Sequence, residues 1–280
     1  SGILCRCTAY VKPVEAVFRA AQIIREEKDQ PAKPLGTLKI VEADEIPETT
    51  VVGRAVPKVD AAKLVQGKPA FTADFVPAGT LVAKVLHSPV AHARIKRIDA
   101  SRARALPGVA AVLTWEDLPR VVYSTAGQSD PIPGPLDTFS LDNKVRFVGD
   151  RVAFVAAETE AIAEKALQLI EVEYEELPAV LDVRDAMKPG APVIHDEPEY
   201  VNFADSDPTH NKAAAIRIDI GNVEQGFLDA DRIYEQEYEV PKVQQAHIEP
   251  HVALSYWDAD GRLVIYSSTQ VPFHARRMLA

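Results

Sequence analysis

The chain has 280 residues, a formal net charge of −10 and a hydrophobic fraction of 47%. That length suits one large or two ordinary domains, and the composition is typical of a globular protein rather than a disordered one. A negative charge without a block of Lys or Arg argues against a nucleic-acid partner. No apolar run approaches the ~20 residues of a membrane span, so association with a membrane is not expected either.

The chain begins with its two cysteines, Cys5 and Cys7, on either side of Arg6. Cysteines this close in sequence rarely reach disulfide geometry, whereas paired thiolates suit a soft metal or an iron–sulfur cluster. A 2Fe–2S cluster normally takes four cysteine ligands, twice the number available here. The residues alone therefore leave two interpretations, half of a cluster site or two unpaired thiols. So few cysteines also favour a reducing compartment, and we expect a cytoplasmic protein.

Apolar residues then recur at helical spacing and predict a helix from Val11 to Glu27. The stretch 28–58 is rich in prolines and charges and has no sustained period, which indicates a linker.

Residues 59–197 alternate short apolar strands with helices, an order that favours an α+β fold with antiparallel strands. Ser101 and Thr159 are expected to cap the helices, and Gly149-Asp150 to form a hairpin-like turn. The proline-rich stretch 124–141 is expected to be a solvated loop. The expected strands are 81–86, 93–98, 109–113, 145–148, 152–156 and 171–177.

The polar stretch 202–212 marks a second boundary. Beyond it, Asp260-Gly261 is typical of a tight hairpin turn between two strands. The expected strands are 216–221, 232–240, 252–257 and 263–267, and the expected helices are 223–229 and 271–280.

Two histidines near the C-terminal end offer a candidate metal site. His247 and His251 flank Glu249, a spacing that suits zinc on a helix. A proline lies inside this pattern and its flanks are strand-like, so hydrogen bonding is the favoured role. His87 and His92 are likewise expected to be structural.

A family resemblance emerges at the N-terminus. Residues 1–10 read S-G-I-L-C-R-C-T-A-Y and precede a helix. They resemble the G-N-[LI]-C-R-C-T-G-Y pattern at the end of the helical 2Fe–2S domain in the xanthine oxidase and aldehyde oxidoreductase family of molybdenum hydroxylases. Ile3 and Ala9 are mild departures. The resemblance implies that Cys5 and Cys7 are ligands of the 2Fe–2S cluster nearest molybdenum, with the other ligand pair preceding Ser1.

The resemblance continues along the chain. Segments 87–93, 148–153 and 172–178 are similar to landmarks of the family's a/b hammerhead domain. Ser267-Ser268-Thr269-Gln270 resembles the family's S-T-Q segment before a helix, which implies that the Gln270 amide lies near the oxo group of molybdenum. A similar glutamate-containing segment around Glu249 belongs to the fold around the cofactor in this family.

Together these matches imply four parts. The end of the 2Fe–2S domain would occupy 1–30, a linker 31–58, the hammerhead domain 59–200, and the start of the molybdenum-cofactor-binding domain 201–280. No catalytic residue is expected within the chain, because the family's phosphate-binding glycines and glutamate base would follow Ala280. The chain alone is therefore expected to be inactive.

The implied function is oxidation of an aldehyde or N-heterocycle with water as the oxygen donor. Electrons would pass from molybdenum through 2Fe–2S clusters. The implied cofactors are a 2Fe–2S cluster and a molybdenum–pterin cofactor in its cytosine dinucleotide form. FAD is not expected in this chain, because a linker stands where some members insert a flavin domain. Expected partners are the remainder of the enzyme, a small-molecule substrate, a separate flavin or electron-acceptor subunit and a second copy.

Two alternatives remain open from the residues. One is a non-catalytic electron-transfer or assembly module that shares these domains. The other is a plain α+β binding domain in which the cysteine pair is accidental. The substrate also stays open among purines, aldehydes and N-heterocyclic acids.

Overall fold

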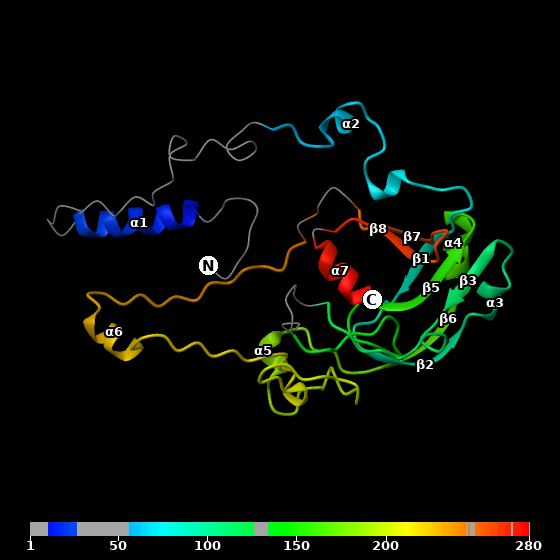
Figure 1. The fold of residues 1–280 in the computed structure, drawn as a ribbon. Coiled ribbons are helices and arrows are strands. Elements are labelled where there is room, and N and C mark those ends of the chain that lie inside the picture. Colours follow the sequence, from blue (N-terminus) through cyan, green and yellow to red (C-terminus); the bar gives the residue numbers. More distant parts are fainter. Residues whose placement is uncertain are drawn as a thin grey trace. The chain divides into compact units, whose positions relative to one another are not determined.

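The computed structural model describes residues 11–26, 56–125, 134–244, 246, 250–269 and 271–279. The chain separates into two compact units, Ser1–Lys68 and Pro69–Ala280. The first unit contains α1 (Val11–Glu26) and α2 (Ala61–Val65) (Figure 1). The predicted N-terminal helix is thus confirmed to within one residue. Among the described residues, no helix is long and apolar enough to cross a bilayer.

Two three-stranded sheets form the centre of the second unit (Figure 1). Every strand pair in the described part of the chain is antiparallel, which confirms the α+β class. The strands of the first sheet, in spatial order, are β1 (Val82–His87), β5 (Arg151–Ala157) and β3 (Val109–Leu113). Those of the second are β4 (Lys144–Val145), β2 (Ala93–Asp99) and β6 (Glu171–Glu176).

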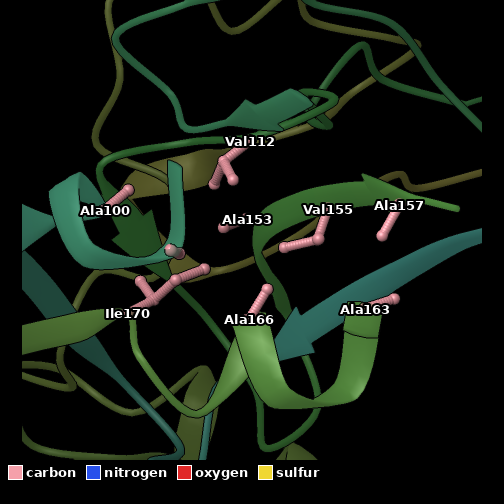
Figure 2. Close-up of a cluster of buried hydrophobic side chains, with 9 residues drawn as sticks. Ala100, Val112, Ala153, Val155, Ala157, Ala163, Ala166 and Ile170 are labelled. Carbon is pink, nitrogen blue, oxygen red and sulfur yellow. The ribbon is translucent and has the colours of Figure 1, made fainter. Parts of the chain in front are cut away.

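One helix, α4 (Glu160–Leu167), packs on the first sheet. Thr159 caps it as predicted, since its side-chain oxygen accepts a hydrogen bond from the Ile162 amide. Figure 2 shows Ala163 and Ala166 of this helix in one buried cluster with Val155 of β5. Alanines bring the helix backbone close to the strand, so the core here is dense although its side chains are small.

A second buried cluster joins the two sheets. Val152 at the start of β5 packs with Ala93, Ile95 and Val145 of the second sheet, and all four are buried. The two sheets therefore share one continuous apolar interior.

The expected hairpin-like turn at Gly149 is wrong. β4 pairs with β2, whereas β5 pairs with β1 and β3, so the chain crosses between sheets here. Gly149, with φ +96°, lies in this crossing, and its amide donates to the Ser88 carbonyl at 2.8 Å. The Ser88 amide in turn donates to the Asp150 carbonyl at 2.8 Å. Contacts to a distant segment, rather than a hairpin ladder, hold the turn.

Several helical turns complete the unit. They are η2 (Thr72–Asp74), α3 (Ser101–Arg104), α5 (Val183–Ala186), η3 (Pro208–His210), α6 (Val223–Asp229) and α7 (Pro272–Leu279). Ser101 does not cap α3 as expected, because the Asp99 carboxylate accepts from the Ser101 amide instead.

Three predictions for irregular regions need correction. The stretches 216–221 and 232–240 are not strands, because no strand of the described residues offers them a hydrogen-bonding partner. The loop 124–141 is not simply solvated in its described part. Phe139 and Leu141 are buried, and Leu136 forms a bridge with Val201.

Candidate functional site

The last part of the chain folds into a hairpin of β7 (Ala253–Trp257) and β8 (Leu263–Ser267). Its register pairs Ala253 with Ser267 and Trp257 with Leu263. The predicted turn at Asp260-Gly261 is confirmed. Gly261 has φ +75°, and the Asp258 carboxylate accepts hydrogen bonds from backbone amides inside the turn. At the other, open end of the hairpin, the chain enters β7 and leaves β8. In the sequence, the histidine pair comes shortly before β7, and the S-T-Q segment comes at the end of β8.

Ser268 ties these two sides together at the open end. Its amide donates to the Val252 carbonyl at 3.3 Å, and its hydroxyl donates to the Pro250 carbonyl at 3.4 Å. The hydroxyl also accepts from the Val252 amide at 3.4 Å. The S-T-Q segment and the segment of the two histidines are therefore neighbours, which their separation in the sequence does not show.

The chain then passes directly into a helix. The Thr269 hydroxyl accepts from the Val271 amide at 3.1 Å, and α7 begins at Pro272. The flanks of Gln270 thus have the strand-then-helix setting that the sequence predicted. Gln270 itself, together with His247 and Glu249, lies outside the described residues. Cys5 and Cys7 lie outside them as well. Within the described ranges, no group of three or more His, Cys, Asp or Glu side chains is placed to hold a metal.

A second polar feature lies beside the second three-stranded sheet and was not anticipated. Arg146, whose side chain is 10% exposed, donates to Asp142 and to Glu197, at 2.8 Å in each case. Arg120 pairs with Asp142 and, at 2.9 Å, with Glu199. His195 Nδ1 donates to Glu197 at 2.7 Å. The charges of Glu199, Arg120, Asp142, Arg146 and Glu197 alternate in sign, and His195 is hydrogen-bonded to the last of them. We call these six residues the ionic chain.

A parallel branch centres on Lys144, whose side chain is 2% exposed. Its ammonium donates to the Ile194 carbonyl and to Asp196, at 2.7 Å in each case. Arg94 of β2 pairs with the same aspartate. Burial lowers the pKa of Lys144. The branch therefore joins β4 and β2 to the same segment, 194–199, that the ionic chain holds.

These contacts determine the protonation of the acidic groups. Burial by itself would raise the pKa of Glu197, but the hydrogen bond from His195 and the charge and hydrogen bond of Arg146 outweigh it and lower the pKa to about 2. Burial would raise the pKa of Asp196, but the hydrogen bond and charge of Lys144 and the charge of Arg94 together outweigh it and lower the pKa. Each cation here already has an acidic partner, so the pocket that they line is not a ready anion site. The arrangement suits a clamp that holds segment 194–199 against the sheets.

The sequence did carry a signal for this clamp. Asp142, Lys144 and Arg146 alternate along an extended stretch, which places three charges on one face of a strand. Three acidic residues, Asp196, Glu197 and Glu199, offer the complementary charges. Only the fold shows that the two stretches meet.

The two structural histidines agree with the prediction. His87 Nδ1 donates to the Gly149 carbonyl at 2.7 Å, and His92 Nδ1 donates to the Pro178 carbonyl at 2.8 Å. His92 is buried, and burial lowers its pKa. Both rings tie distant backbone segments together.

Comparison with known families agrees with this architecture. Residues 66–178 match the family model described as aldehyde oxidase and xanthine dehydrogenase, a/b hammerhead domain. Residues 203–280 match the molybdopterin cofactor-binding domain. These two matches place the chain in the class of the molybdenum-cofactor enzymes.

Individual relatives narrow that class. The probable hypoxanthine oxidase XdhD of Escherichia coli (strain K12) is 45% identical over 82% of this chain and 27% of its own length. The xanthine dehydrogenase molybdenum-binding subunit of Escherichia coli O157:H7 is 36% identical over 79% and 28%. The aldehyde oxidoreductase of Megalodesulfovibrio gigas is 30% identical over 95% and 28%.

A solved structure supports the same assignment. The Cu,Mo-CO dehydrogenase in its carbon monoxide-reduced state superposes with a TM-score of 0.64 at 29% identity, over 80% of this chain and 28% of that one. The chain belongs to the xanthine dehydrogenase and aldehyde oxidoreductase family of molybdenum hydroxylases. It spans about a quarter of the length of the relatives that it matches.

Proposed function

We propose that this chain is part of an enzyme that hydroxylates a carbon centre of an N-heterocycle or an aldehyde. Water supplies the oxygen atom, and two electrons and two protons are released per turnover. The observation that carries the proposal is the order of its two matched regions, a hammerhead domain followed by a molybdopterin cofactor-binding domain. An electron-transfer or assembly module remains the alternative, and no observation favours it.

We propose the same four parts as in the sequence analysis: 2Fe–2S domain end at 1–30, linker at 31–58, hammerhead domain at 59–200 and cofactor-binding domain from 201. The relative from Megalodesulfovibrio gigas supports the first part. The first of the two domain matches begins at residue 66. A similarity that covers 95% of the chain must therefore also include most of residues 1–65.

Cys5 and Cys7 would hold the 2Fe–2S cluster nearest molybdenum. Thiolates are the ligands that such clusters require, so the chemistry of the donor set fits. The cluster supplies one-electron transfer when bound. The two cysteines contribute half of its ligands, and the arginine between them adds positive charge beside an anionic cluster.

Gln270 would donate its amide hydrogen to the oxo group of molybdenum. The described flanks fit this role, because Ser268 and Thr269 fix the backbone on one side and α7 begins on the other. The molybdenum–pterin cofactor, in its cytosine dinucleotide form, supplies oxygen transfer and two-electron oxidation when bound. Gln270 would orient and polarise the ligands around the metal.

Within this class, we propose a purine or related N-heterocycle ahead of an aldehyde. The support is the higher identity to a relative named as a hypoxanthine oxidase than to one named as an aldehyde oxidoreductase.

A flavin or another electron acceptor would reside on a separate subunit, and the enzyme would be a cytoplasmic homo-oligomer. Size-exclusion chromatography with light scattering of the purified enzyme would test the assembly.

Metal analysis and visible absorption of the intact enzyme test the main proposal. We expect one molybdenum per protomer, 2Fe–2S absorption bands, and turnover of hypoxanthine or nicotinate in preference to benzaldehyde. In ¹⁸O-labelled water the product should carry the label. Iron–sulfur bands without molybdenum would instead favour the electron-transfer module, and neither metal would favour a plain binding domain.

Replacement of Gln270 tests the residue assignment. Gln270→Ala should lower turnover by ~10–100-fold, the usual cost of losing a contact to a metal ligand, while iron content and folding stay intact. Gln270→Glu should also be impaired, because a carboxylate places an acceptor against an oxo group that is itself an acceptor. The measurement is steady-state turnover normalised to molybdenum content. Normal turnover in both variants would remove Gln270 from the site.

A further inference from the structure

A short segment ahead of β1 contacts the hairpin that leads to Gln270. The Phe75 ring stacks on Tyr266 of β8, with centroids 5.9 Å apart and planes 23° apart. Tyr266 stacks in turn on Tyr256 of β7, at 6.3 Å and 18°. The two tyrosines are diagonal neighbours, because Tyr256 pairs with Val264, two residues before Tyr266. Three aromatic rings from two distant parts of the chain thus form one row.

The turn that carries Phe75 is closed upon itself. The Asp74 carboxylate accepts from the Ala70 and Phe71 amides, at 2.9 Å in each case. The Phe75 amide donates to the Thr72 carbonyl at 3.2 Å. These bonds hold the backbone of Phe75, so its ring offers Tyr266 a fixed support rather than a loose contact.

Tyr266 lies close to the proposed site along the chain. Ser268, two residues after Tyr266, binds the backbone of Pro250 and Val252. Gln270 follows two residues after Ser268. A shift of β8 at Tyr266 would therefore move the open end of the hairpin. The three stacked side chains are 40%, 42% and 44% exposed, so their loss removes little core and should displace the hairpin without unfolding the domain.

We infer that Phe75 is a positioning residue for the molybdenum site. It supports Tyr266 and thereby sets the position of the C-terminal end of β8, three residues before Gln270 in the sequence. This inference rests on the proposed function of Gln270. It goes further by assigning a role in the reaction to a side chain outside the cofactor-binding domain, from the segment that precedes the first strand of the hammerhead domain.

The test compares variants of the intact enzyme at equal molybdenum content. Phe75→Ala should lower turnover by about three- to tenfold, less than removal of the amide itself. Phe75→Tyr keeps the ring and should restore most of that turnover. Leu81→Ala is the matched control, because Leu81 is 44% exposed and also precedes β1, and it should leave turnover unchanged. The molybdenum(V) paramagnetic resonance spectrum should change in Phe75→Ala only.

A double variant decides whether the effect passes through Gln270. In Phe75→Ala/Gln270→Ala, turnover should equal that of Gln270→Ala alone, because the residue to be positioned is already gone. Independent losses that multiply would overturn the inference. Should Phe75→Ala lose folding, Phe75→Leu, which keeps apolar bulk without the ring, takes its place in both comparisons.

Hydrogen exchange separates this inference from the proposed function. Amides of residues 263–268 should exchange faster in Phe75→Ala, while those of β5 keep their wild-type rates. Unchanged exchange in β8 would refute the support by Phe75, even in an enzyme that holds molybdenum. If the purified protein holds no molybdenum but the β8 amides still exchange faster in Phe75→Ala, the support of Tyr266 by Phe75 stands and the proposed function is rejected.

Discussion

At the scale of single residues, this chain places charge where most proteins place apolar side chains. Lys144 is buried and Arg146 is largely buried, and each has partners on a segment about fifty residues away in the sequence. Burial of a charge is costly unless it is paired and hydrogen-bonded. Both cations have acidic partners, and only Nε of the Arg146 guanidinium is buried without a hydrogen bond. Removal of such a side chain lowers the free energy of unfolding, because its acidic partners remain buried and charged.

Removal of Arg146 should therefore be severe. Arg146→Met leaves Asp142 and Glu197 without their shared cation and should lower the free energy of unfolding by ~3–5 kcal/mol. Arg184→Met is the matched control, because Arg184 pairs with Glu237 at 2.5 Å but both side chains are more than three-quarters exposed. Urea denaturation of both variants measures the difference. Equal and small effects would show that the ionic chain does not hold the fold.

His92 should make stability depend on pH. Burial lowers its pKa below the ordinary 6.5, and Lys144 and Arg146 add repulsion. The unfolded chain then binds a proton more readily, so stability is full above about pH 6.5 and falls as the pH drops toward the folded-state pKa. The slope contributed by one such group cannot exceed ~1.4 kcal/mol per pH unit.

The variant His92→Asn tests this dependence. An asparagine amide can still donate to the Pro178 carbonyl but does not titrate. Denaturation series between pH 5 and 7.5 should show a shallower loss of stability in His92→Asn than in the wild type. Parallel curves would assign the acid sensitivity to other groups.

At the scale of elements, the hammerhead core depends on how closely helix and strand approach. Gly108 lies at the entry to β3 with φ +85°, and its carbonyl accepts from the Glu158 amide at 2.9 Å. A Cβ added at this position would lie 2.7 Å from Cδ1 of Ile162 on α4. Ile162 packs on the buried cluster, so its terminal methyl has little freedom to move.

Gly108→Ala should therefore destabilise by more than backbone strain alone. Gly79→Ala is the matched control, since Gly79 has φ +80° and an added Cβ meets nothing within 4 Å. We expect Gly108→Ala to cost ~1 kcal/mol or more beyond the control. The double variant Gly108→Ala/Ile162→Val, which removes the clashing methyl, should recover much of the excess. Thermal denaturation distinguishes these outcomes, and equal costs for the two glycines would exclude the clash.

At the scale of the whole molecule, the proposed function assigns electron transfer to residues at the two ends of the sequence. In the proposed function, electrons leave the site near Gln270 and reach the cluster held by Cys5 and Cys7. Only the motif context of the cysteines carries the cluster assignment, so it needs a test independent of the hammerhead domain.

Cys5→Ser and Cys7→Ser should each abolish the cluster nearest molybdenum in the intact enzyme. A serine oxygen is a poor substitute for a thiolate at a 2Fe–2S centre. Paramagnetic resonance of the reduced enzyme should lose one iron–sulfur signal while molybdenum content is retained. Persistence of every signal in both variants would reject these ligands.

Local chemistry was readable without the structure. The cap at Thr159 and the turn at Asp260-Gly261 each depend on neighbours within a few residues, and both were predicted correctly. The motif around Cys5 and Cys7 and the S-T-Q segment pointed to the family, which the domain matches bear out.

Only the tertiary structure shows which distant segments of the chain pair with one another. The partition of β4 and β5 into different sheets, the union of Arg146 with Glu197 and the stack of Phe75 on Tyr266 all join residues that lie far apart in the sequence. Apolar alternation at 216–221 predicted a strand, yet a strand also requires a partner for its backbone hydrogen bonds. Sequence periodicity specifies which face of an element is apolar, whereas the neighbour that covers that face is chosen by the packing of the whole chain.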